Sequence, residues 1–378
     1  MSFLAGSAAT AYGSHPGRSA LELMAGAAAD ALVDAGLERG DIDGLVCGYS
    51  TNFPHIMFST VFAEYFGITP IYAQALQLGG ATGLAMAMAA HHAVAAGAAR
   101  RVLVVAGDNR LTGQGRDSAV QVLAGVAHPE YEVPLGLTMP GYYALLASRY
   151  VYERAGEADL AELAVLMRTN AVTHPGAQFR EAITVDDVIA SKRVSPPLKL
   201  LDCCPVSDGA AAFVVTRDPI NDHCLRVLGA GQAHRHMYVT SAPSLLETGA
   251  AASSRHALEQ AGVELDEIEY LAVYDSFTVT LACLLEEIGL APAGMAGRFT
   301  RDGRFDRDGE LPLNTHGGLL SYGHCGVAGA MAHVVEAHRQ MTGRAGVRQL
   351  NRQPTLTLMH GDGGIMSSHV SLVMETAG

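Results

Sequence analysis

The sequence has no tryptophan and few charged residues, which make up 17% of its 378 residues. Basic residues are the minority among them, with 25 Lys and Arg against 38 Asp and Glu, giving a formal net charge of −13. A chain this acidic is a poor partner for nucleic acid or for an anionic membrane surface. Its 49% hydrophobic residues allow a large core, and its length predicts two domains or two fused halves of one.

Cysteine is also scarce, and the six cysteines form no CxxC pair. A chain of this size needs no disulfides to fold, so we expect a reducing, cytoplasmic environment. No group of residues has the spacing of a zinc site, so we predict no metal in this chain. The sequence also has no signal-peptide pattern, no convincing membrane span and no glycine-rich nucleotide loop. These absences argue against secretion, nucleotide hydrolysis and NAD chemistry.

Internal repetition is the most informative feature that is present. Each repeat predicts a helix, an Ala-Gly break, an acidic turn and a buried strand, then a second glycine-rich helix and a second strand. The matching segments are 31–50 with 257–276, 80–99 with 326–345, and 101–108 with 355–362. Because the three pairs follow the same order, we predict an α/β fold of two duplicated halves with helices on both sheet faces.

The segment between the repeats has a different pattern. Helices are expected there at 142–156, 158–175 and 184–191, followed by a buried strand within 201–216. We therefore predict an N-terminal half formed by 1–110 with 201–222, an inserted loop or lid region over 111–200, and a C-terminal half over 223–378.

Residues 77–90, QLGGATGLAMAMAA, predict a glycine turn that leads directly into a helix. Main-chain N–H groups at such a turn can hold a developing anion. Enzymes with this arrangement often carry a nucleophile on the turn, but Gly79 to Thr82 include neither Cys nor Ser. The turn predicts an oxyanion site without a nucleophile.

With these features the sequence resembles the thiolase superfamily, and within it the sterol-carrier-protein-type thiolases. The resemblance extends over essentially the whole chain and implies a thiolase-like fold with five layers in the order α-β-α-β-α. The motifs that carry it are GATG (80–83), SDGAAA (207–212), YDSF (274–277), LPLNTHGG (311–318), GHCGVAG (323–329) and HGDGG (360–364).

Three departures from the family pattern bear on the chemistry. Gly80 stands where thiolases have the nucleophilic cysteine, Tyr274 stands at the Asn or His position, and His360 replaces the second cysteine. This combination is most similar to the steroid side-chain aldolases that lack the nucleophile. The resemblance implies retro-aldol cleavage of a β-hydroxyacyl-CoA, with a steroid or other bulky acyl group, to a ketone and a shorter acyl-CoA such as propionyl-CoA or acetyl-CoA.

The resemblance also implies the partners and the site. We expect a homodimer, a small OB-fold and zinc-ribbon partner protein, and coenzyme A only as part of the substrate. The proton carriers expected in the site are Tyr274, Tyr322, His324 and His360. The expected main-chain cradle for the thioester enolate is formed around Gly80, Gly361 and Gly363.

Two other functions stay open at this point. One is acyl transfer through a displaced cysteine, for which Cys325 beside His324 is the candidate. The other is a non-catalytic subunit that binds acyl-CoA or lipid for a partner. Tyrosines and histidines at the catalytic positions argue against a silent subunit.

Overall fold

The computed structural model describes residues 1–115 and 121–377. The strands are β1 (Phe3–Ala9), β2 (Gly44–Gly48), β3 (Tyr72–Leu76), β4 (Arg101–Asn109), β5 (Arg193–Ser195), β6 (Leu198–Lys199), β7 (Asp208–Thr216), β8 (Leu225–His234), β9 (Tyr270–Val273), β10 (Leu356–Gly363) and β11 (Ser368–Thr376). The helices are α1 (Ala20–Ala35), α2 (Phe58–Phe66), α3 (Thr82–Ala95), α5 (Met139–Glu153), α6 (Glu157–Ala171), α7 (Val185–Ala190), α8 (Ala250–Ala261), α9 (Thr278–Ile288), α10 (Ala296–Arg301) and α11 (Val327–Met341).

Nine strands form one mixed sheet in the order β3-β2-β4-β7-β1-β8-β11-β10-β9. The first five of these belong to the N-terminal half and the last four to the C-terminal half. The halves join where β1 pairs with β8, at Phe3 opposite Arg226 and Leu4 opposite Leu225. The predicted α/β fold of two related halves is confirmed, with the two sheets continuous at this point.

The repeated segments fold alike in the two halves. Helix α1 leads to β2 in the first half, and α8 leads to β9 in the second. Both helices end at a glycine in the left-handed region, Gly36 with φ 69° and Gly262 with φ 68°. A residue with a Cβ is strained in that conformation, which explains the Ala-Gly break in both copies.

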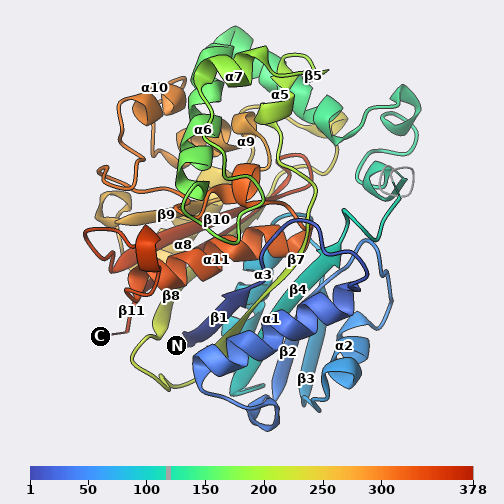
Figure 1. The fold of residues 1–378 in the computed structure, drawn as a ribbon, viewed down its shortest axis with the longest axis vertical. Helices are drawn as coiled ribbons and strands as arrows, with labels where there is room; N and C mark the ends of the chain where they lie inside the picture. The colour runs from blue at the N-terminus through green and yellow to red at the C-terminus, as the bar shows by residue number, and fades with distance from the viewer. Residues whose placement is uncertain (116–120, 378) are drawn as a thin grey trace.

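The helices make the layers that the family resemblance implied (Figure 1). Helices α1 and α2 cover the outer face of the first half, and α8 covers the outer face of the second. Helices α3 and α11 pack against each other between the two halves. The result is the α-β-α-β-α order, with the start of both central helices directed to one region.

The segment between the halves supplies α5, α6 and α7, which lie beside α9 and α10 (Figure 1). The helix expected at 142–156 runs from Met139 to Glu153, three residues earlier at both ends. Pro140 explains the earlier start, since proline is well suited to the first turn of a helix, where its missing N–H is not needed. None of the helices in the described part of the chain is long and apolar enough to cross a membrane.

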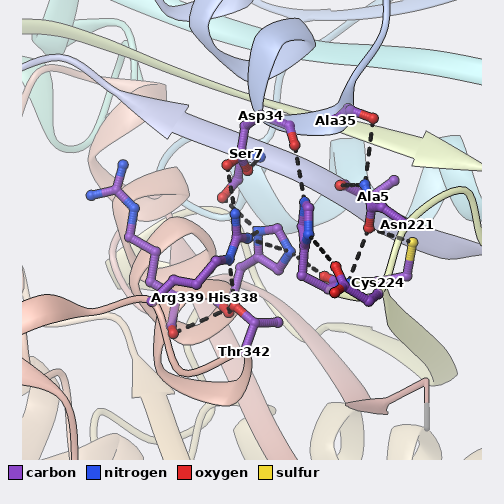
Figure 2. Close-up of polar contacts among 12 residues, drawn as sticks. Ala5, Ser7, Asp34, Ala35, Asn221, Cys224, His338, Arg339 and Thr342 are labelled. Carbon is purple, nitrogen blue, oxygen red and sulfur yellow. Dashed lines mark hydrogen bonds and ion pairs between the residues drawn. The ribbon is translucent and has the colours of Figure 1, made fainter.

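A partly buried polar cluster beside β1 also connects the two halves (Figure 2). Ser7 Oγ lies 2.7 Å from His338 Nδ1, and His338 Nε2 lies 2.8 Å from the carbonyl oxygen of His223. Asp34 accepts from the Ser7 N–H at 2.8 Å and pairs with Arg344 at 2.6 Å. We call these residues the polar clamp. Because the His223 carbonyl oxygen can only accept a hydrogen bond, the neutral ring of His338 carries its proton on Nε2.

The polar clamp makes the stability of the fold depend on pH. Burial, and next the charge of Arg344, lower the pKa of His338 to about 3, against an ordinary value of 6.5. Below pH 6.5 the unfolded chain binds a proton at His338 that the folded chain does not. The free energy of unfolding should therefore fall as the pH drops from 6.5 towards 3, with His338 contributing up to about 1.4 kcal/mol per pH unit.

Urea unfolding at several pH values between about 4 and 8 tests this dependence. His338→Gln should be less stable at neutral pH but should lose stability less steeply on acidification. The matched control is His55→Gln, which replaces an exposed histidine. Equal slopes for His338→Gln and the wild type would rule out the polar clamp as a source of the acid sensitivity.

Candidate active site

A cavity of about 240 Å³ lies where the two halves and the inserted helices meet. Tyr49, Arg110 and Tyr274 line it, and each directly follows the end of a strand, β2, β4 and β9 respectively. The other lining residues are Thr51, Gly79, Gly80, Leu123, Val126, Met139, Pro140, Tyr143, Cys203, Cys204, Pro205, Val206, Ser276, Phe277, His324, Gly326 and Gly364. Ligand sites of α/β proteins usually lie at the carboxyl ends of strands, as this cavity does.

Two of the residues predicted for catalysis meet in this cavity. Tyr274 Oη lies 3.0 Å from His324 Nε2, and the Gly326 N–H donates to His324 Nδ1 at 3.2 Å. Since Nδ1 accepts, the proton of the neutral ring is on Nε2, which donates to Tyr274 Oη. The hydroxyl proton of Tyr274 is then not used by His324 and is available to a bound substrate.

Both members of the pair are neutral over the physiological range. Burial raises the pKa of the Tyr274 hydroxyl well above its usual value of 10. Burial, aided by the positive charge of Arg110, lowers the pKa of His324 to about 3. In the free protein this pair therefore consists of a phenol and an uncharged imidazole.

Hydrogen bonds on both sides of Tyr274 fix its backbone. The side chain of Asn314 accepts from the Val273 N–H at 2.9 Å and donates to the Val273 carbonyl at 2.7 Å. The Tyr274 N–H donates to the carbonyl of His360 at 2.9 Å. On the other side, the Asp275 carboxylate accepts from the Leu319 N–H at 2.7 Å. The LPLNTHGG and YDSF motifs thus act together to place one phenol.

His324 is fixed by the SDGAAA motif. Its N–H donates to Ser207 Oγ at 2.9 Å, and its carbonyl accepts from the Ser207 N–H at 3.1 Å. This double contact connects the loop before α11 to the loop before β7. The imidazole is therefore held from the first half although it belongs to the second.

Gly80 lies against Tyr274. A Cβ at this position would collide with Tyr274 Oη and with the carbonyl oxygen of Asp362. The space that a nucleophile would need at residue 80 is occupied by the phenol. Thr82 braces the turn, since its hydroxyl donates to the Gly79 carbonyl at 2.6 Å and accepts from the Leu78 N–H at 2.8 Å.

The thiolase N-terminal domain family matches residues 4–218, and the thiolase C-terminal domain-like family matches residues 231–376. The chain belongs to the thiolase superfamily. This match confirms the resemblance predicted from the motifs. Individual relatives and solved structures give further detail.

Relatives of this thiolase-superfamily chain include both aldolases and acetyltransferases. It is 32% identical over 362 residues to a steroid side-chain-cleaving aldolase of Thermomonospora curvata, covering 87% of this chain and 88% of the aldolase. It is 29% identical over 361 residues to an acetyl-CoA acetyltransferase of Methanothermobacter thermautotrophicus, covering 92% and 93%. The solved structure of an Ltp2-ChsH2(DUF35) aldolase superposes with a TM-score of 0.84 at 31% identity, covering 99% of this chain and 97% of that one.

Two of the predicted proton carriers in this thiolase-like chain do not line the cavity. Tyr322 Oη donates to the Thr10 carbonyl at 2.9 Å and is buried among other aromatic rings. His360 lies 2.8 Å from Ser371 Oγ and 3.1 Å from His369 Nδ1, and burial lowers its pKa. Both residues are close in sequence to residues that line the cavity, but their own side chains are directed into the protein core.

The predicted glycines also differ in what they do. Gly361 and Gly363 lie on β10 where it packs against the turn before α3, and a Cβ on Gly363 would collide with the Leu78 carbonyl. The glycine of this motif that lines the cavity is Gly364. Of the glycines around the predicted main-chain cradle, Gly79, Gly80 and Gly364 line the cavity, and Gly361 and Gly363 do not.

Sequence reasoning missed two further phenols in the cavity, Tyr49 and Tyr143. Tyr143 comes from α5 in the inserted region and stacks on Phe277 with ring centroids 4.3 Å apart. Its Oη lies 3.0 Å from the Gly364 carbonyl and 3.2 Å from Asp362 Oδ2. Burial raises the pKa of Asp362 well above its usual range. Asp362 is part of the HGDGG motif, but nothing in the pattern of α5 distinguished Tyr143 from a core residue.

Within residues 1–115 and 121–377, no three His, Cys, Asp or Glu side chains are grouped as metal ligands would be. A metal-free chain stays a prediction.

Arg110, the cavity residue that follows β4, was also not singled out from the sequence.

Restoring a cysteine at residue 80 should not restore thiolase chemistry. We expect Gly80→Cys to displace Tyr274 and break its contact with His324, so that cleavage activity is lost and no acetoacetyl-CoA is made. The measurements are acetoacetyl-CoA synthesis and intact-protein mass after incubation with acetyl-CoA. Gly26→Ala is the control, since a Cβ there meets no neighbouring atom within 4 Å. An acyl-cysteine that turns over in Gly80→Cys would show that the site tolerates the thiolase nucleophile.

Proposed function

We propose that this protein cleaves a β-hydroxyacyl-CoA by a retro-aldol reaction, giving a ketone or aldehyde and a shorter acyl-CoA. The observation that carries the proposal is the contact between Tyr274 and Gly80. It puts a phenol, held by His324, in the space of the thiolase nucleophile. Relatives that include steroid side-chain aldolases support the same chemistry.

The reaction moves one proton from the β-hydroxyl oxygen to Cα. As the Cα–Cβ bond breaks, its electrons pass to Cα and the thioester carbonyl, and the β-oxygen becomes the carbonyl oxygen of the leaving fragment. In our proposal Tyr274 Oη accepts the β-hydroxyl proton while its own proton passes to Cα. The His324 Nε2–H keeps Oη oriented during this exchange.

Main-chain groups provide the site for the thioester oxygen in this proposal. Gly79 and Gly80 line the cavity just before Ala81, the N-cap of α3, where the helix dipole favours negative charge. Gly364 brings the backbone after β10 to the same wall. Such preorganised donors stabilise an enolate without a covalent bond to the enzyme.

Acyl transfer is the second candidate, because acetyl-CoA acetyltransferases are relatives and two cysteines line the cavity. Those cysteines are Cys203 and Cys204, whereas Cys325 is buried outside the lining. Burial raises the pKa of all three thiols. A reactive thiolate is therefore disfavoured at each of them.

We also propose an acyl-CoA thioester as substrate, a homodimer, and a small OB-fold and zinc-ribbon partner. The acyl-CoA follows from the family. The small partner is supported by the solved Ltp2-ChsH2(DUF35) aldolase, in which an Ltp2 aldolase is named together with a DUF35 protein. A cytoplasmic location likewise remains a proposal.

The direct test of the function uses β-hydroxyacyl-CoAs in the absence of free coenzyme A, with and without the small partner. A retro-aldol cleavage should give a ketone or aldehyde and a shorter acyl-CoA in equal amounts. Thiolytic acyl transfer needs a β-ketoacyl-CoA and free coenzyme A, so cleavage seen only with that pair of substrates in a parallel assay would favour the thiolase alternative. Binding of acyl-CoA without any turnover would favour a non-catalytic subunit.

Two tyrosine variants separate the proposed catalytic phenol from a buried packing phenol. Tyr274→Phe should lower kcat about 10²- to 10⁴-fold while acyl-CoA binding persists, because the ring and the cavity remain. Tyr322→Phe loses one internal hydrogen bond, with a cost on the order of 1 kcal/mol in stability, and should keep its turnover. Steady-state kinetics and thermal unfolding of both variants give the comparison. Full activity in Tyr274→Phe would remove the phenol from the mechanism.

A further inference from the structure

Arg110 is the one formally charged side chain among the described residues that line the cavity. It directly follows β4. Its side chain lies close to Gly326, since a Cβ built on that glycine would be 3.7 Å from Arg110 Cδ. Gly326 in turn donates to His324 at 3.2 Å. The guanidinium thus belongs to the wall of the cavity beside the Tyr274–His324 pair.

Two other arginines with largely buried side chains have carboxylate partners, whereas the buried Arg168 is held by Ser321 Oγ and the Glu181 carbonyl oxygen. Arg154 pairs with Glu286 at 2.8 Å, and Arg348 pairs with Glu336 at 2.8 Å. Arg110 forms no ion pair with any described residue, and its buried Nε has no hydrogen-bond partner among them.

The carboxylate nearest in sequence is already engaged. Asp108 accepts from Ser50 Oγ at 2.9 Å and from both the N–H and the hydroxyl of Thr51 at 2.6 Å. It also accepts from the Asn52 N–H at 3.3 Å. These contacts hold the loop after β2 and leave Arg110 to the cavity.

The remaining cavity wall is uncharged. His324 and Tyr274 are neutral, and apolar side chains such as Val126, Met139 and Phe277 cover much of the surface. A cation in such surroundings is poorly solvated, and a bound anion compensates for that cost. The fork of a guanidinium matches a carboxylate with two parallel hydrogen bonds.

We propose that the acyl group of the substrate carries a second acidic group, a carboxylate, and that Arg110 binds it. The inference rests on the proposed retro-aldol function and names its substrate class: a β-hydroxyacyl-CoA derived from a dicarboxylic acid. The phosphates of coenzyme A are a poor match, because the pantetheine arm separates them from the reacting carbons beside His324. The cavity of about 240 Å³ also suits a compact acyl group better than the polycyclic one expected from the sequence.

The test compares two thioesters with the same skeleton, 3-hydroxy-3-methylglutaryl-CoA and its terminal carboxamide. The wild type should prefer the acid, and Arg110→Gln should reduce the ratio of kcat/KM for acid over amide about 10- to 100-fold. Arg110→Lys should recover part of the ratio. Arg100→Gln is the matched control, since this exposed arginine precedes the other end of β4 and pairs with Asp218 at the surface.

Equilibrium binding of the same two thioesters separates the inference from the function. Cleavage of both compounds with an unchanged ratio in Arg110→Gln would overturn the carboxylate site and leave the retro-aldol function standing. Acid-selective binding that is lost in Arg110→Gln, without cleavage of any β-hydroxyacyl-CoA, would support the site and overturn the function. If neither acid-selective binding nor cleavage is observed, both the carboxylate site and the retro-aldol function are overturned.

Discussion

The candidate site depends on the close approach of the Tyr274 hydroxyl to the main chain at Gly80, and the proposed chemistry depends on the same contact. No side chain fits at residue 80 while the phenol is in place, so a cysteine nucleophile and this phenol are mutually exclusive. The Asp362 carbonyl oxygen approaches the same point, so the missing nucleophile goes together with both the tyrosine of the YDSF motif and the position of β10. The packing of β10 against the same turn adds to the constraint, because Gly363 has to admit the Leu78 carbonyl.

The duplication of the fold explains how few elements are needed to build the cavity. Gly80 and Gly326 occupy equivalent turns before α3 and α11, and both line it. Arg110 and Gly364 follow the equivalent strands β4 and β10, and they line it too. Each half thus presents the same two backbone positions to one space, and the halves differ in the side chains that they place there.

The parts of the structure that depend on local pattern could be predicted from the sequence. The repeats gave the two halves and the helix ends at Gly36 and Gly262, and the motifs brought Tyr274 and His324 together. The motifs could not say which way a side chain in them points, so Tyr322 and His360, both buried outside the cavity, were included. Tyr143 was missed because its contact with the cavity depends on how α5 packs, which no local pattern encodes.

Burial drives the pKa of Tyr274 up and that of His324 down, away from neutrality in opposite directions. Neither group is then suited to a mechanism that requires a stable phenolate or imidazolium, and the same burial disfavours a thiolate on Cys204. Retro-aldol cleavage makes no such demand, because the proton leaving oxygen and the proton reaching carbon balance within the cavity. A neutral hydroxyl that accepts one proton while it gives another keeps its charge throughout. A cavity whose described lining holds a single charged side chain favours this kind of proton exchange over steps that separate charge.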